Sequence, residues 1–350
     1  MTPDFANQGC PVPLFDTERV LLGHGGGGRL SAELLKAVFL PAFGNDVLNA
    51  LEDQAILPFG DGRLAFTTDS YVVRPLFFPG GDIGRLAVNG TVNDLAVGGA
   101  VPLFLSAAFI LEEGLPITDL RRVVESMRTA CAAAGVSIAT GDTKVVDRGK
   151  CDGMFVTTAG IGLVPAGVSL SARNARAGDR VLVSGTVGDH GIAVMSVREG
   201  LDFETVLESD TAPLHDLTRA MLAACLPIRC MRDPTRGGVA SALNELAAAS
   251  KVGIKLTEAA IPLRAEVRAA CELLGLDPLY VACEGRLLAV APPGDADRLL
   301  TAMRDHPLGH RAAIVGEVVA EHAGIVTVRT PIGGERVLPL LAGDQLPRIC

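Results

Sequence analysis

Apolar and polar positions in the first half of the chain form blocks that predict alternating strands and helices. Strands are expected over residues 64–73, 102–111, 137–146 and 154–164. Helices are expected over residues 30–41, 82–97 and 117–135. Pro41 and Gly135 stand where the first and third of these helices should end.

The second half shows shorter blocks of both kinds. Strands are expected over residues 180–184 and near 254, 280, 287, 314, 326 and 337. Helices are expected from residue 191 and over residues 215–226, 238–250, 264–274 and 295–304. Proline and turn residues interrupt the regular alternation that a doubly wound sheet needs, so the pattern predicts two α+β domains.

The chain divides best within residues 169–179, which are rich in Ser, Ala, Arg and Gly. We therefore expect an irregular arm over residues 1–17, one domain over residues 18–168 and a second over residues 169–341. The last nine residues, 342–350, have little periodicity and are expected to form a mobile tail.

Composition narrows the class of protein. The 350 residues are 49% hydrophobic and 20% charged, with a net charge of -9, which is typical of a globular protein. Because no Lys/Arg-rich run is present, we expect no nucleic-acid partner. The longest uncharged stretches are broken by Gly and Pro, which argues against a membrane span. Eight cysteines without a CxxC pair predict free thiols and a cytoplasmic location.

A glycine run after the short apolar segment 19–22 is the first candidate for chemistry. Its spacing satisfies G-x-G-x-x-G, but Arg29 and Leu30 stand where a phosphate-binding P-loop requires Lys and Ser or Thr. Backbone N–H groups of such a loop can still surround phosphate oxygens. The candidate nucleotide-binding residues are Gly25, Gly26, Gly27 and Gly28. A flexible surface loop is the alternative.

Acidic residues in short polar islands between apolar blocks are the second candidate. They are Glu52, Asp53, Asp69, Asp94, Asp142 and Asp233. Mg²⁺ takes oxygen ligands and often shares them with substrate phosphates, so these carboxylates could hold Mg²⁺ and a nucleotide. Taken singly, each residue fits a turn former or a helix N-cap better than a metal ligand, whereas their regular placement as a set favours the metal site.

Three further residues or segments are candidates for phosphate or proton chemistry. Residues 233–239 precede an apolar-periodic helix, whose N-terminus would suit a phosphate, although an ordinary capped turn is the alternative. Lys144 lies in a Gly/Thr-rich island beside an acid and could contact phosphate or assist proton transfer, or be simply solvated. Glu284, between two apolar blocks, is expected to be half-buried with a raised pKa suited to a general base; a turn residue is the alternative.

The chain ends on a cysteine. Cys350 could be incidental, but the seven residues after Gly343 could span roughly 23 Å when extended. That reach would let a terminal thiol move between a site on its own protein and one on a partner.

Taken together, these segments resemble the HypE family of hydrogenase maturation proteins. The matching pieces are residues 23–28, 67–73, 86–102, 140–146, 233–240, 282–285 and the terminal Pro-Arg-Ile-Cys of residues 347–350. The family lies in the ATP-binding superfamily of aminoimidazole ribonucleotide synthetase, selenophosphate synthetase and thiamine-monophosphate kinase. The resemblance covers nearly the whole chain and implies two mixed α/β domains of that type, with the N-terminal sheets joined in a homodimer.

The resemblance also implies an activity. A carbamoyltransferase, HypF, would place a carbamoyl group on Cys350, and the protein would use ATP to dehydrate it to a thiocyanate. The cyanide would then pass to iron held by a HypC–HypD complex, for [NiFe]-hydrogenase. By resemblance Cys350, Glu284 and Lys144 are catalytic; Asp142, Thr143 and Asp233 bind nucleotide; and Asp53, Asp69, Asp94 and Asp233 bind Mg²⁺.

Two alternatives remain open at this point. One is a kinase-like enzyme of the same superfamily acting on a small molecule, although selenophosphate synthetase has a reactive Cys–Lys region where this chain has His24 and glycines. The other is a non-enzymatic carrier, gated by ATP, whose tail only docks on partners.

Overall fold

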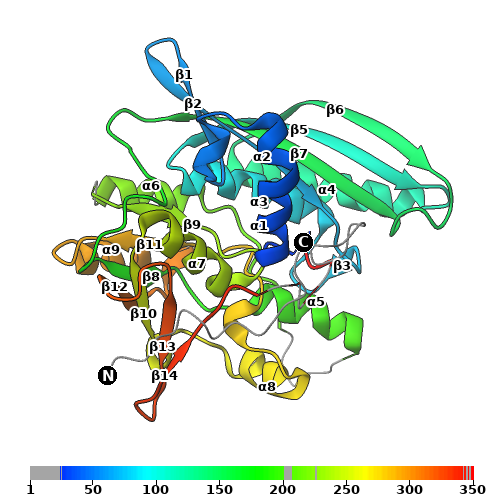
Figure 1. The fold of residues 1–350 in the computed structure, drawn as a ribbon. Helices are drawn as coiled ribbons and strands as arrows, with labels where there is room; N and C mark the ends of the chain where they lie inside the picture. The colour runs from blue at the N-terminus through cyan, green and yellow to red at the C-terminus, as the bar shows by residue number, and fades with distance from the viewer. Residues whose placement is uncertain are drawn as a thin grey trace.

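The computed structural model describes residues 24, 26–200, 207–224, 227–341, 343, 346 and 348–350. It shows two mixed α/β units, each built on one large sheet (Figure 1). The α+β class predicted from the sequence is confirmed. The predicted arm, the apolar segment 19–22 and Gly25 lie outside the described residues.

The first sheet has five strands in the order β1-β2-β7-β5-β6. The strands are β1 (Ala55–Phe59), β2 (Gly62–Tyr71), β5 (Val101–Glu112), β6 (Ser137–Val146) and β7 (Met154–Val164). Neighbouring strands are antiparallel except for the β5–β6 pair, which is parallel. In β2, Ala65 and Thr67 are buried whereas Phe66 and Thr68 are exposed, so one face of the sheet is covered and the other is open.

Two helices cover the closed face, α3 (Ile83–Val97) and α4 (Ile117–Ala134). Helix α3 begins where the Asp82 side chain accepts hydrogen bonds from the N–H groups of Gly84 and Arg85. Almost every residue of α3 is buried, because it packs on its own sheet and also on α6 and β9 of the second unit. This helix is therefore the central contact between the two halves.

The second sheet has seven strands in the order β14-β13-β10-β12-β8-β11-β9. They are β8 (Arg180–Val183), β9 (Cys230–Arg232), β10 (Gly253–Thr257), β11 (Leu288–Ala291), β12 (Ala313–Val319), β13 (Val326–Arg329) and β14 (Glu335–Val337). Its helices are α5 (Asp189–Glu199), α6 (His215–Ala224), α7 (Gly238–Ser250), α8 (Ala265–Leu274) and α9 (Ala296–Arg304). Val181 and Val183 pack with α7 whereas Leu182 packs with α6 and α9, so helices cover both faces.

The structure corrects two expectations. The first helix does not end at Pro41: α1 (Arg29–Leu34) runs through a π-helical turn, η3 (Leu35–Phe39), into α2 (Leu40–Phe43). Pro41 stands in the first turn of α2, directly after the π-helical turn, and the helix passes through it to Phe43. The strand expected near Tyr280 is instead a 3-10 turn, η6 (Pro278–Tyr280), because the Asp277 side chain caps the N–H of Leu279.

Several short elements were not predicted. They are β1, β9, the two-residue strands β3 (Phe77–Phe78) and β4 (Gly81–Asp82), and the 3-10 turns η4 (Leu48–Ala50), η5 (Glu258–Ala260) and η7 (Pro307–Gly309). In the described part of the chain, no helix is both long and apolar enough to cross a bilayer. The described cysteines are free thiols.

The described residues of the C-terminal tail are docked between the two units (Figure 1). Leu346 and Ile349 are buried in the same core cluster as residues of both halves. The N–H of Val72 donates to the Cys350 carbonyl (3.0 Å) and the N–H of Arg74 to that of Arg348 (3.2 Å), so the tail runs along the end of β2. The Arg348 side chain pairs with Asp152 at 2.7 Å.

A buried histidine holds the tail from the other side. His190, in the first turn of α5, lies 2.8 Å from the Ile349 carbonyl through Nε2 and 2.8 Å from Ser209 Oγ through Nδ1. Its ring meets that of Phe78 edge-on. Burial lowers the pKa of His190 to about 4, so the neutral ring donates from Nε2 to the tail and accepts from Ser209.

We predict that His190 makes stability depend on pH. An unfolded histidine titrates near 6.5, so the neutral folded ring contributes stability above that pH, and the contribution is lost as pH falls toward 4. Between about pH 7 and about pH 4.5 the free energy of unfolding of the wild type should fall by about 2 kcal/mol more than that of His190→Gln. Glutamine keeps a donor for Ile349 but does not titrate. Equal slopes in urea unfolding of the two proteins would contradict this assignment.

Candidate active site

Carboxyl groups from both units meet beside the end of α3. Asp69 is on β2, Asp94 is on α3, and Asp53 precedes β1, whereas Asp233 follows β9 of the second unit. Thr67 Oγ1 lies 2.7 Å from Asp94 Oδ2 and 3.0 Å from the Asp53 carbonyl, which ties these two segments together. The structure thus brings together the four residues that the sequence predicted to bind metal.

The surroundings of these four carboxyl groups favour their neutral, protonated forms. Burial raises the pKa of all four, and the pKa of Asp233 rises to about 8. After burial, the largest influence on Asp94 is the charge of Asp69, followed by that of Asp233 and of Asp53. Because the groups repel one another in a poorly solvated site, a bound cation would be strongly favoured there.

Two arginines offset part of this charge. Arg232 on β9 lies 3.1 Å from Asp53 and 2.6 Å from Glu245 of α7. Arg236 lies 3.8 Å from Asp69. The negative charge of Cys350 is the largest influence raising the pKa of Arg236, and those of Asp69 and Glu284 add to it. Arg236 therefore stands between the acidic cluster and the end of the tail.

Glu284 faces the same site from the segment between η6 and β11. Its side chain was expected to be half-buried, but the residue is only 3% exposed and is therefore fully buried. Burial is the main cause that raises its pKa well above the ordinary value, and the charges of Asp233, Asp210 and Asp69 raise it further. Its Oε1 atom has no hydrogen-bond partner among the described residues. A buried carboxyl with an unused oxygen is suited to exchange a proton with a substrate.

Glycines let three segments approach closely at this point. Gly237 and Gly238, which open α7, have positive φ, and a Cβ on Gly238 would lie 2.6 Å from the Leu279 carbonyl and 2.7 Å from that of Val281. Gly27 also has a positive φ, and a Cβ there would lie 3.1 Å from the Cβ of Arg236. A side chain on Gly28 would overlap the Leu341 carbonyl. The glycine loop thus packs against residues 236–237, and this close approach depends on the absence of side chains in the loop.

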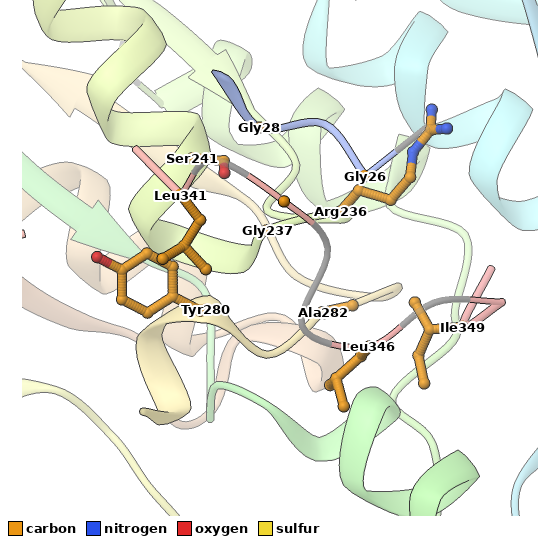
Figure 2. Close-up of a pocket in the computed structure, with 11 residues that line it drawn as sticks. Gly26, Gly28, Arg236, Gly237, Ser241, Tyr280, Ala282, Leu341, Leu346 and Ile349 are labelled. Carbon is orange, nitrogen blue, oxygen red and sulfur yellow. The ribbon is translucent and has the colours of Figure 1, made fainter. Parts of the chain in front are cut away.

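The space between these segments is small in this structure. Figure 2 shows Gly26, Arg236, Gly237 and Ala282 around one cavity, with the tail residues Leu346 and Ile349 forming part of its wall. The cavity holds about 10 Å³, which is room for a single water. A nucleotide would have to move the tail or the glycine loop to enter from this side.

The remaining predicted residues lie elsewhere. Asp142, Thr143 and Lys144 are on β6, the edge strand of the first sheet, and Lys144 pairs with Asp142 at 3.2 Å. Their side chains are exposed, that of Lys144 by 72% and that of Asp142 by 64%. Three strand spacings separate the row of Asp69 from that of β6, or roughly 14 Å. One chain alone therefore does not bring these residues to the acidic cluster.

The donor set fits a magnesium ion. Carboxylate oxygens are the ligands that Mg²⁺ prefers, and it commonly uses one or two of them together with substrate phosphates. Within the described residues, no three Asp, Glu, His or Cys side chains are arranged to hold a metal by themselves. A metal that shares its ligands with substrate phosphates would not need a closed cage of side chains.

Sequence reasoning did not single out several residues of this site. Arg236 lies within residues 233–239, which were predicted to bind phosphate, and Arg232 directly precedes them, so the motif carried a signal for both. Asn93 and Asp210 hydrogen-bond to the backbone of Glu284, and no local pattern marks either of them. Such contacts join positions more than seventy residues apart.

Each of the two units matches a known protein family. The family described as AIR synthase related protein, N-terminal domain, matches residues 51–164. The family described as AIR synthase related protein, C-terminal domain, matches residues 176–329. Together the two matches cover most of the chain.

Curated relatives agree in name and length. "Carbamoyl dehydratase HypE" of Azotobacter vinelandii is 57% identical over 93% of this chain and 96% of its own. The protein of the same name from Escherichia coli (strain K12) is 48% identical over 95% of this chain and 99% of its own.

Solved structures give the same result. The hydrogenase maturation protein HypE in complex with ATP is 48% identical, with a TM-score of 0.80 over 95% of this chain and 100% of that chain. A HypE–HypF complex contains a chain that is 48% identical, with a TM-score of 0.84 over 88% of this chain and 99% of that one. The chain therefore belongs to the HypE family of carbamoyl dehydratases, built from the two AIR synthase related domains.

Proposed function

We propose that this protein uses ATP to dehydrate an S-carbamoyl group on its own Cys350 to a thiocyanate. The observation that carries the proposal is the place of the tail. Ile349, the residue before Cys350, lines the same cavity as Arg236, and Arg236 pairs with Asp69. The negative charges of Cys350 and Glu284 both raise the pKa of Arg236. A chain end that lies beside this cavity supports a role for the Cys350 thiol in the chemistry of the acidic cluster.

The reaction balances with ATP as the acceptor of the amide oxygen. The carboxamide oxygen attacks the γ-phosphorus and ADP leaves. The C–O bond then breaks as phosphate departs, and the nitrogen gives up its two protons to form the C≡N bond. Phosphoryl transfer of this kind relies on positioning and on neutralising charge, and a cluster at the junction of two domains can supply both.

The acidic cluster and the glycine loop would bind the nucleotide. A relative that is 48% identical has been solved with ATP, which supports ATP as the substrate here. Asp53, Asp69, Asp94 and Asp233 would hold Mg²⁺, which offsets phosphate charge when it is bound. Gly25, Gly26, Gly27 and Gly28 would cover the phosphates with backbone N–H groups.

Glu284 and Lys144 would handle the protons. Glu284 is buried at the site and has an oxygen without a partner in the described part of the chain, so it can accept a proton from the substrate nitrogen. Lys144 is on the exposed edge strand, as are Asp142 and Thr143, which would bind nucleotide. These three residues can take part only if the open face of the first sheet is covered.

A second copy of the chain would cover that face. Along the strands the outward positions include Phe66, Phe104, Ile110 and Leu163, all of which are exposed. An apolar sheet face of this kind is typical of an interface rather than of a free surface. We therefore propose a homodimer in which the two five-stranded sheets pack together and bury β6.

The partners are those that the resemblance to the HypE family implies. A HypE–HypF complex is known for a relative that is 48% identical, which supports HypF as the donor of the carbamoyl group. We propose that the cyanide passes to iron held by a HypC–HypD complex and that these steps take place in the cytoplasm. The tail would have to leave its docked position to reach either partner.

The two alternative functions predict different roles for the tail. A small-molecule kinase or an ATP-gated carrier would not need Cys350 beside the acidic cluster. Thiamine-monophosphate kinase of Aquifex aeolicus (20% identical, TM-score 0.63) shares the fold, and this likeness does not bear on activity. The position of Cys350 favours the dehydratase over both.

We predict that Cys350→Ala abolishes thiocyanate formation while ATP binding changes less than about twofold. The wild type is incubated with the carbamoyltransferase, carbamoyl phosphate and ATP, and its C-terminal peptide is weighed by mass spectrometry. The carbamoylated peptide should lose the mass of one water. Cys151→Ala, which removes another half-buried thiol, is the matched control and should react like the wild type. A wild-type peptide that stays carbamoylated would overturn the proposal.

We predict that a charge on the open sheet face separates the dimer. Phe104 is 48% exposed on that face, and burying a glutamate there without a partner would be costly. Light scattering should give about twice the 36.3 kDa chain mass for the wild type and the single-chain mass for Phe104→Glu. Ile332→Glu, at a 96% exposed position between β13 and β14, should remain dimeric. A Phe104→Glu protein of unchanged mass would place the interface elsewhere.

A further inference from the structure

Glu284 lies on a segment without regular secondary structure, between η6 and β11. A helix or strand would fix the backbone through its own hydrogen-bond ladder, whereas an irregular segment needs partners from elsewhere. The position of the Glu284 carboxyl group therefore depends on the residues that hold the neighbouring peptide groups.

Two buried side chains hold the peptide groups of Glu284 itself. The N–H of Glu284 donates to Asp210 Oδ1 at 3.0 Å. The Glu284 carbonyl accepts from Asn93 Nδ2 at 3.0 Å. The two preceding residues are also held, because the Ala282 carbonyl accepts from Gly191 and the N–H of Cys283 donates to the Pro234 carbonyl. The main chain is thus satisfied while the Glu284 side chain keeps an oxygen without a described partner.

Asn93 belongs to the same helix as Asp94 of the acidic cluster. Its amide also donates to the Ala212 carbonyl at 3.1 Å and accepts from the N–H of Leu214 at 2.8 Å. One buried amide therefore joins α3 of the first unit to two segments of the second. Because Asp94 is the next residue, any shift of Asn93 changes the distance between the acidic cluster and Glu284.

Asp210 has a second effect. Its side chain is fully buried, and Arg286 Nε lies 3.5 Å from its Oδ2. A side chain on Gly285 would overlap the Asp210 carbonyl, so the two segments are in direct backbone contact. The charge of Asp210 also helps to raise the pKa of Glu284, after burial and the charge of Asp233.

We propose that Asn93 and Asp210 are positioning residues that set the place of the Glu284 carboxyl group relative to the acidic cluster. The inference rests on the proposed role of Glu284 in proton transfer. It requires that changes at Asn93 act on the chemical step through Glu284, and not on ATP binding or on folding alone.

Asn93→Ala tests this inference against a matched control. The control is Asn89→Ala, one turn earlier on α3, where an equally buried amide donates to Thr211 but does not touch Glu284. In single turnovers of carbamoylated protein with ATP, Asn93→Ala should slow thiocyanate formation by about 10- to 100-fold, while the Kd for ATP stays within about twofold. Asn89→Ala should slow it less than about twofold, although both variants lose thermal stability. Equal rates for the two variants would overturn the inference.

Glu284→Gln separates the inference from the proposed function. If Glu284→Gln converts the carbamoyl group at the wild-type rate, the proposed role of Glu284 fails and the inference fails with it. If Glu284→Gln is slow and Asn93→Ala is normal, only the inference fails. If Asn93 acts through Glu284, adding Asn93→Ala to Glu284→Gln should cause no further loss. Multiplied losses would show an independent role and count against the inference.

Two more variants, Asn93→Asp and Asp210→Asn, test the same inference by other changes. Should Asn93→Ala not fold, Asn93→Asp keeps the acceptor for Leu214 and removes the amide donor to Glu284, and it should slow the reaction likewise.

Asp210→Asn keeps an acceptor for the N–H of Glu284 but removes a charge. The titratable groups that influence Glu284 are Asp233, Asp210, Asp69 and Arg236. Because the Asp210 charge raises the pKa of Glu284, removing it lowers that pKa, so the rising limb of the rate profile should move to lower pH. An unmoved limb would exclude Asp210 from this role.

Discussion

Repulsion among buried carboxyl groups is the constraint on which this site depends. Asp53, Asp69, Asp94 and Asp233 come from both units. Burial raises the pKa of each, and neighbouring carboxyl charges raise those of Asp53, Asp94 and Asp233 further. Among the described residues, Arg232 pairs with Asp53 and Arg236 with Asp69. Such a cluster costs folding free energy that the packing around α3 has to offset. It is suited to a cation and a polyphosphate arriving together, since each supplies the charge that the other needs.

The C-terminal tail is bound at the edge of this site and closes part of it. Its described residues continue the hydrogen bonding at the end of β2 and bury Leu346 and Ile349 in the core shared by the two units. The chain end that we propose to visit partner proteins thus also forms part of the wall of the cavity beside the glycine loop. Main-chain hydrogen bonds, a neutral histidine and one exposed ion pair hold it, and such contacts are weak enough individually to be exchanged for those of a partner.

Much of the fold and part of the site could be predicted from the sequence. The strands β2, β5, β6 and β7 and the helices α3 and α4 were expected where they are, because each carries a clear periodicity or capping signal. The path through Pro41 and the 3-10 turn at Tyr280 were missed, because a π-helical turn and a capped three-residue turn leave little periodic pattern. The short strands β1 and β9 are defined by their pairing with distant strands.

The sequence by itself determined which residues could do the chemistry: carboxylates in polar islands, a glycine run, Glu284 and a terminal cysteine. Motifs consist of neighbouring residues, so they can be recognised in the sequence without knowledge of the fold. Only the tertiary structure decided which of them meet. It brought four aspartates, Glu284 and the end of the tail to one place, and it left Asp142 and Lys144 on an exposed edge strand. Distances across a sheet and between domains arise from packing, and no spacing along the chain encodes them.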